Sequence, residues 1–202
     1  MIRNLFPVAL GDYQLDRRVT KKEIAFIKKQ KTYKNHGNTT SENHKILDSK
    51  TLKAIKDFIV EKTNQYFEEV YRPSGDVRLE ITQSWCNYTE PGQYHHKHAH
   101  PNSFISGVFY LEADIEKDKI FFYKDQYETL VVPTSDWNLW NSKSWWFEAG
   151  TGKLFLFPSS LTHMVPITES DQTRISLSFN TFPVGSLGVD REVTALHIDG
   201  AK

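Results

Sequence analysis

The sequence concentrates histidine, the commonest protein ligand for transition metals, in one short segment. This segment holds four of the eight histidines, at His95, His96, His98 and His100. On a β-strand, His96, His98 and His100 would project from one face, because alternate residues share a face. His95 would then point to the opposite face, into solvent. His163 lies far downstream, and a close pair from one strand with one distant ligand would build a metal site with open positions.

A second segment alternates polar and apolar side chains. On a strand, one of its faces would be apolar and the other would carry Arg174, Ser176, Ser178 and Asn180. A guanidinium group matches a carboxylate as a two-pronged donor, so this face predicts a polar cavity in which Arg174 binds a carboxylate. The structural alternative is an ion pair of Arg174 with Asp171 or Glu169.

Two helices are expected to brace the part of the chain that carries these residues. Thr20 and Glu23 could cap a helix that continues to about Gln30. Apolar residues at helical spacing predict a second helix over 49–71, which ends before Gly75. Residues 31–48 are polar and are expected to form a mobile loop, which could close over a substrate or be a tolerated surface insertion.

After Asp76 the pattern changes to short β-branched and aromatic runs separated by turns. These predict about eight strands, the number that a jelly roll needs, at 77–88, 104–112, 119–123, 129–132, 144–148, 153–158, 163–168 and 174–182. We expect a single domain that is mainly β with N-terminal helices. Its parts would be a helical support region over 1–75, a β core over 76–185 and a tail over 186–202.

Composition limits the partners and the compartment. Lys+Arg and Asp+Glu both number 25, and this balance argues against nucleic acid or an anionic membrane held by bulk charge. The single cysteine, Cys86, cannot form an internal disulfide and is expected to be a buried strand residue. No signal-peptide pattern and no apolar run long enough for a membrane span are visible. We therefore expect a soluble, cytoplasmic protein.

Three sequence blocks together resemble the 2-oxoglutarate/iron(II)-dependent dioxygenases. In chain order they are His98-x-His100 followed by Pro-Asn-Ser and a strand, Phe157-Pro-Ser-x-Leu-x-His163, and Arg174-x-Ser176. The likeness covers about residues 80–183 and is nearest to a small branch of oxygenases common in phages and marine bacteria. A phage-encoded member would act in the host cytoplasm. It implies the double-stranded β-helix, a distorted jelly roll related to the cupins.

The resemblance also implies a chemistry. Iron(II) would be held by His98, His100 and His163, and 2-oxoglutarate and O2 would bind at the open positions. The far carboxylate of 2-oxoglutarate would pair with Arg174 and Ser176, and further polar contacts to this cosubstrate would come from Asn87, Tyr88 and Asn180. Decarboxylation of 2-oxoglutarate to succinate and CO2 would drive hydroxylation of an unactivated C–H bond. The primary substrate is unknown, with a prolyl or other protein residue as one candidate class and a small molecule as another.

One departure from the family pattern leaves alternatives open. Most members carry His-x-Asp or His-x-Glu at the first ligand pair, whereas no histidine of this cluster has an acid two positions on. His96 with His98 is the alternative register for that pair. A three-histidine site also occurs in cupin dioxygenases and in zinc enzymes that activate water. The alternatives are therefore a cupin-like oxygenase or metal hydrolase that does not use 2-oxoglutarate, and a non-catalytic jelly-roll binding or structural module.

Overall fold

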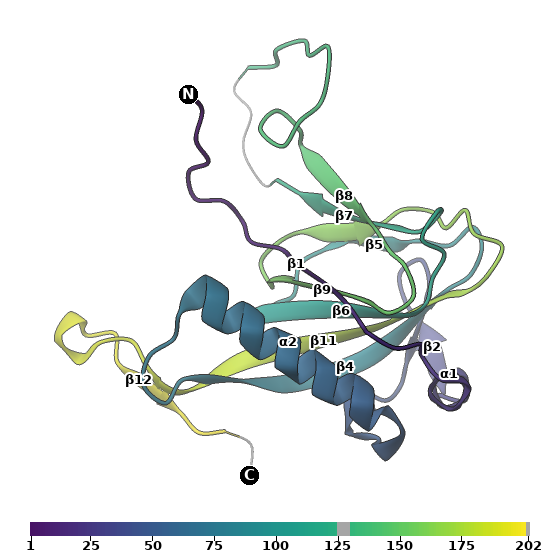
Figure 1. The fold of residues 1–202 in the computed structure, drawn as a ribbon, viewed down its shortest axis with the longest axis horizontal. Helices are drawn as coiled ribbons and strands as arrows, with labels where there is room; N and C mark the ends of the chain where they lie inside the picture. Colours follow the sequence, from purple (N-terminus) through teal and green to yellow (C-terminus); the bar gives the residue numbers. More distant parts are fainter. Residues whose placement is uncertain (125–129, 201–202) are drawn as a thin grey trace.

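The computed structural model describes residues 1–124 and 130–200, and it is mainly β with helices near the N-terminus, as expected (Figure 1). The described strands form two antiparallel sheets. The major sheet has the order β1 (Gly11–Gln14), β9 (Lys153–Pro158), β6 (Ile105–Glu112), β11 (Arg174–Leu187), β4 (Arg78–Thr89), β3 (Thr39–Ser41) and β2 (Thr32–Lys34), with β12 (Leu196–Ile198) paired to β11. The minor sheet has the order β5 (His95–His98), β10 (His163–Val165), β7 (Lys119–Tyr123) and β8 (Ser144–Glu148).

Both predicted helices are present. Helix α1 (Lys21–Lys28) begins with the capping box, in which Thr20 and Glu23 satisfy each other's backbone N–H groups. Two short 3-10 turns, Ile46–Asp48 and Lys50–Leu52, lead into α2 (Lys53–Tyr71), which lies across one face of the major sheet (Figure 1). Within the described residues, neither helix combines the length and the apolarity that a membrane span requires.

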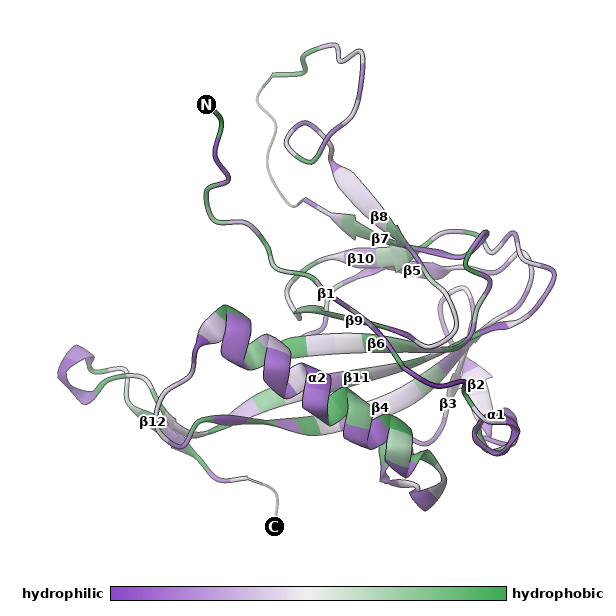
Figure 2. Ribbon diagram, in the orientation of Figure 1, coloured by the Kyte–Doolittle hydropathy of each residue, from purple (hydrophilic) through white to green (hydrophobic). Residues whose placement is uncertain are grey.

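The apolar residues divide between the two faces of the major sheet. Under α2, the buried face of the helix packs on apolar side chains of the sheet, and Figure 2 shows hydrophobic segments on the strands that it crosses. Ile175, Leu177 and Phe179 of β11 belong to this cluster. Their neighbours Ser176 and Ser178 are buried on the opposite face, so β11 has the two chemically distinct faces that its sequence predicts. The polar face is therefore the one that a site between the sheets can use.

Several short elements differ from the prediction. Residues 31–48, expected to be a loop, contain the hairpin β2–β3, which adds to the sheet beside β4, and β1 pairs with β9. These strands are short and polar, so they lack the apolar alternation from which a strand is predicted. They are strands because they form hydrogen bonds with neighbouring strands. The prediction of a strand over 129–132 is wrong for residues 130–132, which are exposed and pair with no other strand. Residue 129 lies outside the described residues.

Gly107 sits where β6 passes under a packed aromatic ring, and we expect Gly107→Ala to destabilise the fold. A Cβ at this position would overlap the ring of Phe179 and approach Leu156. Overpacking of this kind costs about 1–3 kcal/mol of unfolding free energy. Urea denaturation measures it, and the smaller side chain in Gly107→Ala/Phe179→Leu should recover part of the loss. Equal stability of Gly107→Ala and the wild type would contradict this packing.

Candidate metal centre

Three of the predicted ligands converge between the ends of two minor-sheet strands. His98 ends β5 and pairs directly with His163, the first residue of β10, while His100 lies in the connection to β6. The ring centroids of His98 and His163 are 4.4 Å apart, and each lies 5.1 Å from that of His100. One ligand nitrogen from each of the three lies within 4.8 Å of the others. We call this set the inner triad; it brings His98, not His96, together with His100 and His163.

Backbone carbonyls fix two of these imidazoles. The Nδ1 atom of His98 lies 2.7 Å from the carbonyl oxygen of His96, and the Nδ1 atom of His163 lies 3.0 Å from that of Leu161. A carbonyl oxygen only accepts hydrogen bonds, so each Nδ1 carries the proton and donates it. Each Nε2 is left with a free lone pair, as a metal ligand requires.

A side chain fixes the third imidazole. The Nδ1 atom of His100 lies 2.6 Å from Oδ1 of Asn180 on β11 and 3.1 Å from Oγ of Ser106 on β6. Ser106 in turn donates to the same Asn180 oxygen at 2.9 Å and lies 2.8 Å from Oγ of Ser159. Asn180, which the resemblance placed against the cosubstrate, therefore orients the imidazole of His100. The sequence placed Asn180 on the correct face but gave no signal for its partner.

The donor set fits a transition-metal ion. Nitrogen ligands lie about 2.0–2.1 Å from such a metal, so two ligands at angles between 90° and tetrahedral are about 2.8–3.4 Å apart. The Nε2 atoms of His98 and His100 are 3.2 Å apart. Burial also keeps the rings neutral: it lowers the pKa of His98 to about 4 and that of His163 to about 3, and it lowers the pKa of His100. Neutral imidazole is the form that binds a metal.

Replacing Asn180 by alanine is expected to weaken metal binding about 10–100-fold, as loss of a group that orients a metal-bound histidine usually does. The His100 ring would keep only Ser106 as its partner. Calorimetric titration with Ni(II) against a competing chelator measures the affinity. Thr63→Ala, at a buried polar position on α2, serves as the control. Equal Ni(II) affinity in Asn180→Ala and the control would show that His100 does not depend on this contact.

The metal-free protein is expected to lose stability as the pH falls below 6.5, the ordinary pKa of histidine. In the unfolded chain the triad takes up protons near that value, whereas folded His98 and His163 stay neutral until about pH 4 and about pH 3. The unfolded state then binds more protons, so the free energy of unfolding decreases with decreasing pH across this window. Chemical denaturation at several pH values measures the slope, which should be shallower in His163→Gln. An identical slope would contradict the assignment.

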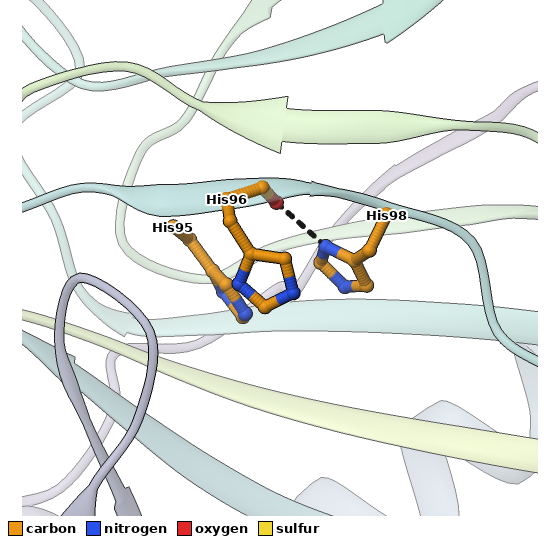
Figure 3. Close-up of side chains that lie close together, drawn as sticks. All are labelled: His95, His96 and His98. Atoms are coloured by element: carbon orange, nitrogen blue, oxygen red, sulfur yellow. Dashed lines mark hydrogen bonds between the residues drawn. The ribbon is translucent and has the colours of Figure 1, made fainter.

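His95 does not point away from its neighbours as strict alternation predicts. Between β5 and β10 the register shifts, because the four residues His95–His98 face the three residues His163–Val165. This β-bulge turns the His95 ring toward the same side as His98, where the two rings stack 4.7 Å apart at 25° (Figure 3). Sequence reasoning missed the bulge, since no glycine or proline marks it.

Arg174 is buried at the start of β11, on the polar face that its sequence predicts. The ion pair considered with Asp171 or Glu169 is not the one formed. Its Nη1 lies 3.5 Å from Oδ1 of Asp118, which is equally buried, while Asp171 pairs with Lys117. Burial raises the pKa of Asp118 and lowers that of Arg174. Each charge in this pair is therefore costly without the other.

Other buried polar groups lie along the same face. Ser176 is opposite Asn87 on β4 and Tyr110 on β6, and the amide nitrogen of Asn87 donates to Ser178. Four atoms in this region are buried without a hydrogen-bond partner, namely Asn87 Oδ1, Tyr110 Oη, Asp118 Oδ1 and Arg174 Nε. Unsatisfied buried groups are rare and commonly mark where a ligand or water binds. Of these four atoms, Tyr110 Oη and Arg174 Nε are donors and could bind a carboxylate. We call the set of buried polar side chains on this face the polar row: Asn87, Tyr110, Asp118, Arg174, Ser176 and Ser178. Sequence reasoning missed Tyr110 and Asp118, whose roles depend on contacts across strands.

Tyr88 does not belong to the polar row. Its side chain lies on the helix side of β4, and its hydroxyl donates to the backbone oxygen of Ile27 in α1 at 2.7 Å. Tyr88 therefore points away from the face on which contacts with the cosubstrate are expected. Cys86, two residues earlier, is fully buried on the same side, where burial raises the pKa of its thiol, as expected for a core residue.

Comparison of structures identifies the fold. The epimerase SnoN from nogalamycin biosynthesis, in complex with Fe3+, alpha-ketoglutarate and nogalamycin RO, has a TM-score of 0.63 at 9% identity, covering 88% of this chain and 81% of that chain. HygX from Streptomyces hygroscopicus, with nickel, 2-oxoglutarate and hygromycin B bound, has a TM-score of 0.56 at 8% identity, covering 86% and 82%. A prolyl-4-hydroxylase from Pseudomonas putida has a TM-score of 0.54 at 11% identity, covering 86% and 92%. They confirm the predicted double-stranded β-helix.

Comparison of sequences finds one similar family. No curated protein matches the chain. The family model described as "Putative 2OG-Fe(II) oxygenase" matches residues 83–180. This range contains the inner triad, the polar row and all or part of the strands that carry them. The narrower placement in a branch of phages and marine bacteria stays a prediction. Sequence match and fold agree: residues 83–180 are similar to a 2-oxoglutarate/iron(II)-dependent oxygenase family, and the fold is the one that solved oxygenases of this superfamily have.

Proposed function

We propose that this protein is an Fe(II)- and 2-oxoglutarate-dependent dioxygenase that hydroxylates an unactivated C–H bond with release of succinate and CO2. The observation that carries the proposal is the combination of two features, one carried mainly by the minor sheet and the other by β11 of the major sheet. One is a triad of neutral histidines whose Nε2 atoms converge, and the other is a buried arginine at the far end of the polar row. HygX and SnoN, solved with a metal and 2-oxoglutarate or alpha-ketoglutarate, support this assignment.

The residues divide the work between metal and cosubstrate. His98, His100 and His163 hold Fe(II), which when bound supplies the reaction of O2 with 2-oxoglutarate. Arg174 binds the far carboxylate of 2-oxoglutarate through its guanidinium group. The hydroxyl of Ser176 donates a hydrogen bond to the same carboxylate. Asp118 holds Arg174 in place and neutralises it before the cosubstrate arrives. The surrounding buried side chains exclude water from this end of the site.

The ligand set favours one alternative strongly enough to be tested beside the first. The inner triad contains no carboxylate, so the bound metal would carry one more positive charge than in the usual His-acid-His site. A cupin-like oxygenase or a metal hydrolase could use the same three histidines without 2-oxoglutarate. Only the dioxygenase reading requires Arg174 to bind a ligand, so this arginine separates the two.

Metal-dependent binding of 2-oxoglutarate tests the proposal. Ni(II), the metal present in the HygX structure, is loaded in place of Fe(II), and 2-oxoglutarate is titrated calorimetrically. We expect one cosubstrate to bind when Ni(II) is present and much weaker binding in its absence. Succinate, which lacks the keto oxygen, is the matched control and should bind more weakly. Binding that is independent of metal would contradict the proposal. The likeness to a prolyl-4-hydroxylase supports prolyl peptides as the first substrates to test.

A further inference from the structure

Three histidines gather at a second place, on the more exposed side of the inner triad. One ligand nitrogen from each of His95, His96 and His98 lies within 4.8 Å of the others, and all three residues are partly exposed. Figure 3 shows their rings projecting from β5 to the same side, as the β-bulge requires. Their ring centroids are 4.7–5.3 Å apart. We call this set the outer triad.

The hairpin between β2 and β3 braces the outer triad. The His36 ring stacks on that of His96 at 5.1 Å and 29°, and the His36 carbonyl oxygen accepts a hydrogen bond from His96 Nδ1 at 3.4 Å. That bond leaves the Nε2 of His96 free to bind a metal. Gly37 packs closely on Tyr94, whose backbone N–H donates to the Gly37 carbonyl. Residues of the segment expected to form a mobile loop thus hold a ligand in place.

One nitrogen is common to both triads. His98 donates its Nδ1 proton to the His96 carbonyl, so Nε2 is its remaining ligand atom. The same Nε2 lies 3.2 Å from that of His100. A single ion can therefore bind His98 from the outer side or from the inner side, but two ions cannot both use this nitrogen at once.

We propose that His95 and His96, together with His98, form an outer site for a divalent transition-metal ion, from which the ion is loaded into the inner triad. The ion keeps its bond to His98 Nε2 while the bonds to His95 and His96 are replaced by bonds to His100 and His163. Every bond that is broken or formed joins the ion to an imidazole nitrogen lone pair, so the exchange moves no electron and leaves the oxidation state of the ion unchanged. Three nitrogen ligands without a carboxylate favour Co(II), Ni(II), Cu(II) and Zn(II) over Mg(II).

The outer site is tested without the inner one. In His100→Ala/His163→Ala, Co(II) is titrated and followed by its visible absorption. We expect one equivalent to bind, more weakly than in the wild type. The further change His96→Gln should weaken that binding by about tenfold or more, because loss of a group that only hydrogen-bonds to a metal ligand already lowers affinity by about this factor. His197→Gln, at an exposed histidine remote in sequence from the outer triad, is the matched control. No binding in the double variant, or binding insensitive to His96→Gln, would overturn the outer site.

The loading role is tested in the otherwise intact protein by stopped-flow mixing with Co(II). This role rests on the inner triad being the functional metal site proposed above, whereas the outer site itself does not. His96→Gln keeps the backbone carbonyl that orients His98, so the final Co(II) spectrum should match that of the wild type. The loading rate should fall about tenfold, in line with loss of one ligand, and should be unchanged in His197→Gln. Equal Co(II) loading rates in the wild type and His96→Gln would overturn the loading role of the outer site. Both readouts follow the metal, so they are independent of whether 2-oxoglutarate is consumed.

Discussion

Replacing His163 by alanine is expected to abolish tight metal binding and the consumption of 2-oxoglutarate while the protein stays folded. His163 is the one member of the inner triad that lies on β10. Its backbone pairs with β5 and β7, and this pairing does not depend on the imidazole ring. Loss of a direct ligand should cost more than the roughly 10–100-fold that loss of a supporting group costs. Ni(II) calorimetry measures the affinity, and circular dichroism with urea denaturation reports on the fold.

His197→Ala is the control for this change, because His197 is an exposed histidine on β12 and belongs to neither triad. It should leave Ni(II) affinity and turnover as they are in the wild type. Tight, stoichiometric Ni(II) binding that survives in a folded His163→Ala variant would remove the basis for the inner triad. Residual weak binding is expected, because the outer triad is intact in this variant.

Replacing Arg174 by methionine is expected to weaken 2-oxoglutarate binding while metal affinity is retained. Truncating one partner of a buried charge pair costs about 2–5 kcal/mol, or about thirtyfold or more in affinity. The change also leaves Asp118 buried beside an apolar side chain, which should destabilise the fold by about 3 kcal/mol. That destabilisation should shrink at low pH, because burial raises the pKa of Asp118 and a protonated carboxyl needs no cation. Calorimetry and urea denaturation measure the two effects.

A second substitution separates the two roles of Arg174. In Arg174→Met/Asp118→Asn the buried charge is gone, so stability should recover, while 2-oxoglutarate affinity should stay low. The opposite results would be recovery of 2-oxoglutarate binding in the double variant, or binding of 2-oxoglutarate by Arg174→Met as in the wild type. Either result would make the arginine a structural ion-pair partner and would support the cupin-like oxygenase or metal hydrolase instead. The pair was unpredictable from sequence, since Asp118 is far from Arg174 along the chain and ends a polar turn.

Sequence periodicity predicted those features that one strand or helix determines by itself. The capping box at Thr20, the span of α2 and the two faces of β11 follow from local spacing and residue type. Features that depend on pairing between distant segments did not. The hairpin β2–β3 is polar, and it becomes a strand pair because β4 offers an unpaired edge.

The candidate site shows the same division. The grouping of His98 and His100 with His163 follows from their order and from the apolar strands next to them, β6 after His100 and β9 before His163. The His95 side chain is turned by a register shift between β5 and β10, and strict alternation cannot anticipate such a shift. Asn180 was placed on the correct face, but its contact with His100 joins two segments eighty residues apart. A strand's face can be read from its sequence, whereas the partner across that face cannot.

Formation of succinate tests the central claim most directly. The protein is loaded anaerobically with Fe(II) and 2-oxoglutarate, exposed to air, and followed by proton NMR, with His163→Ala and Arg174→Met/Asp118→Asn in parallel. Slow uncoupled turnover of the cosubstrate means that the primary substrate need not be known. We expect iron-dependent succinate from the wild type and little or none from the two variants. A wild type that binds Fe(II) yet forms no succinate and shows no metal-dependent binding of 2-oxoglutarate would contradict the assignment.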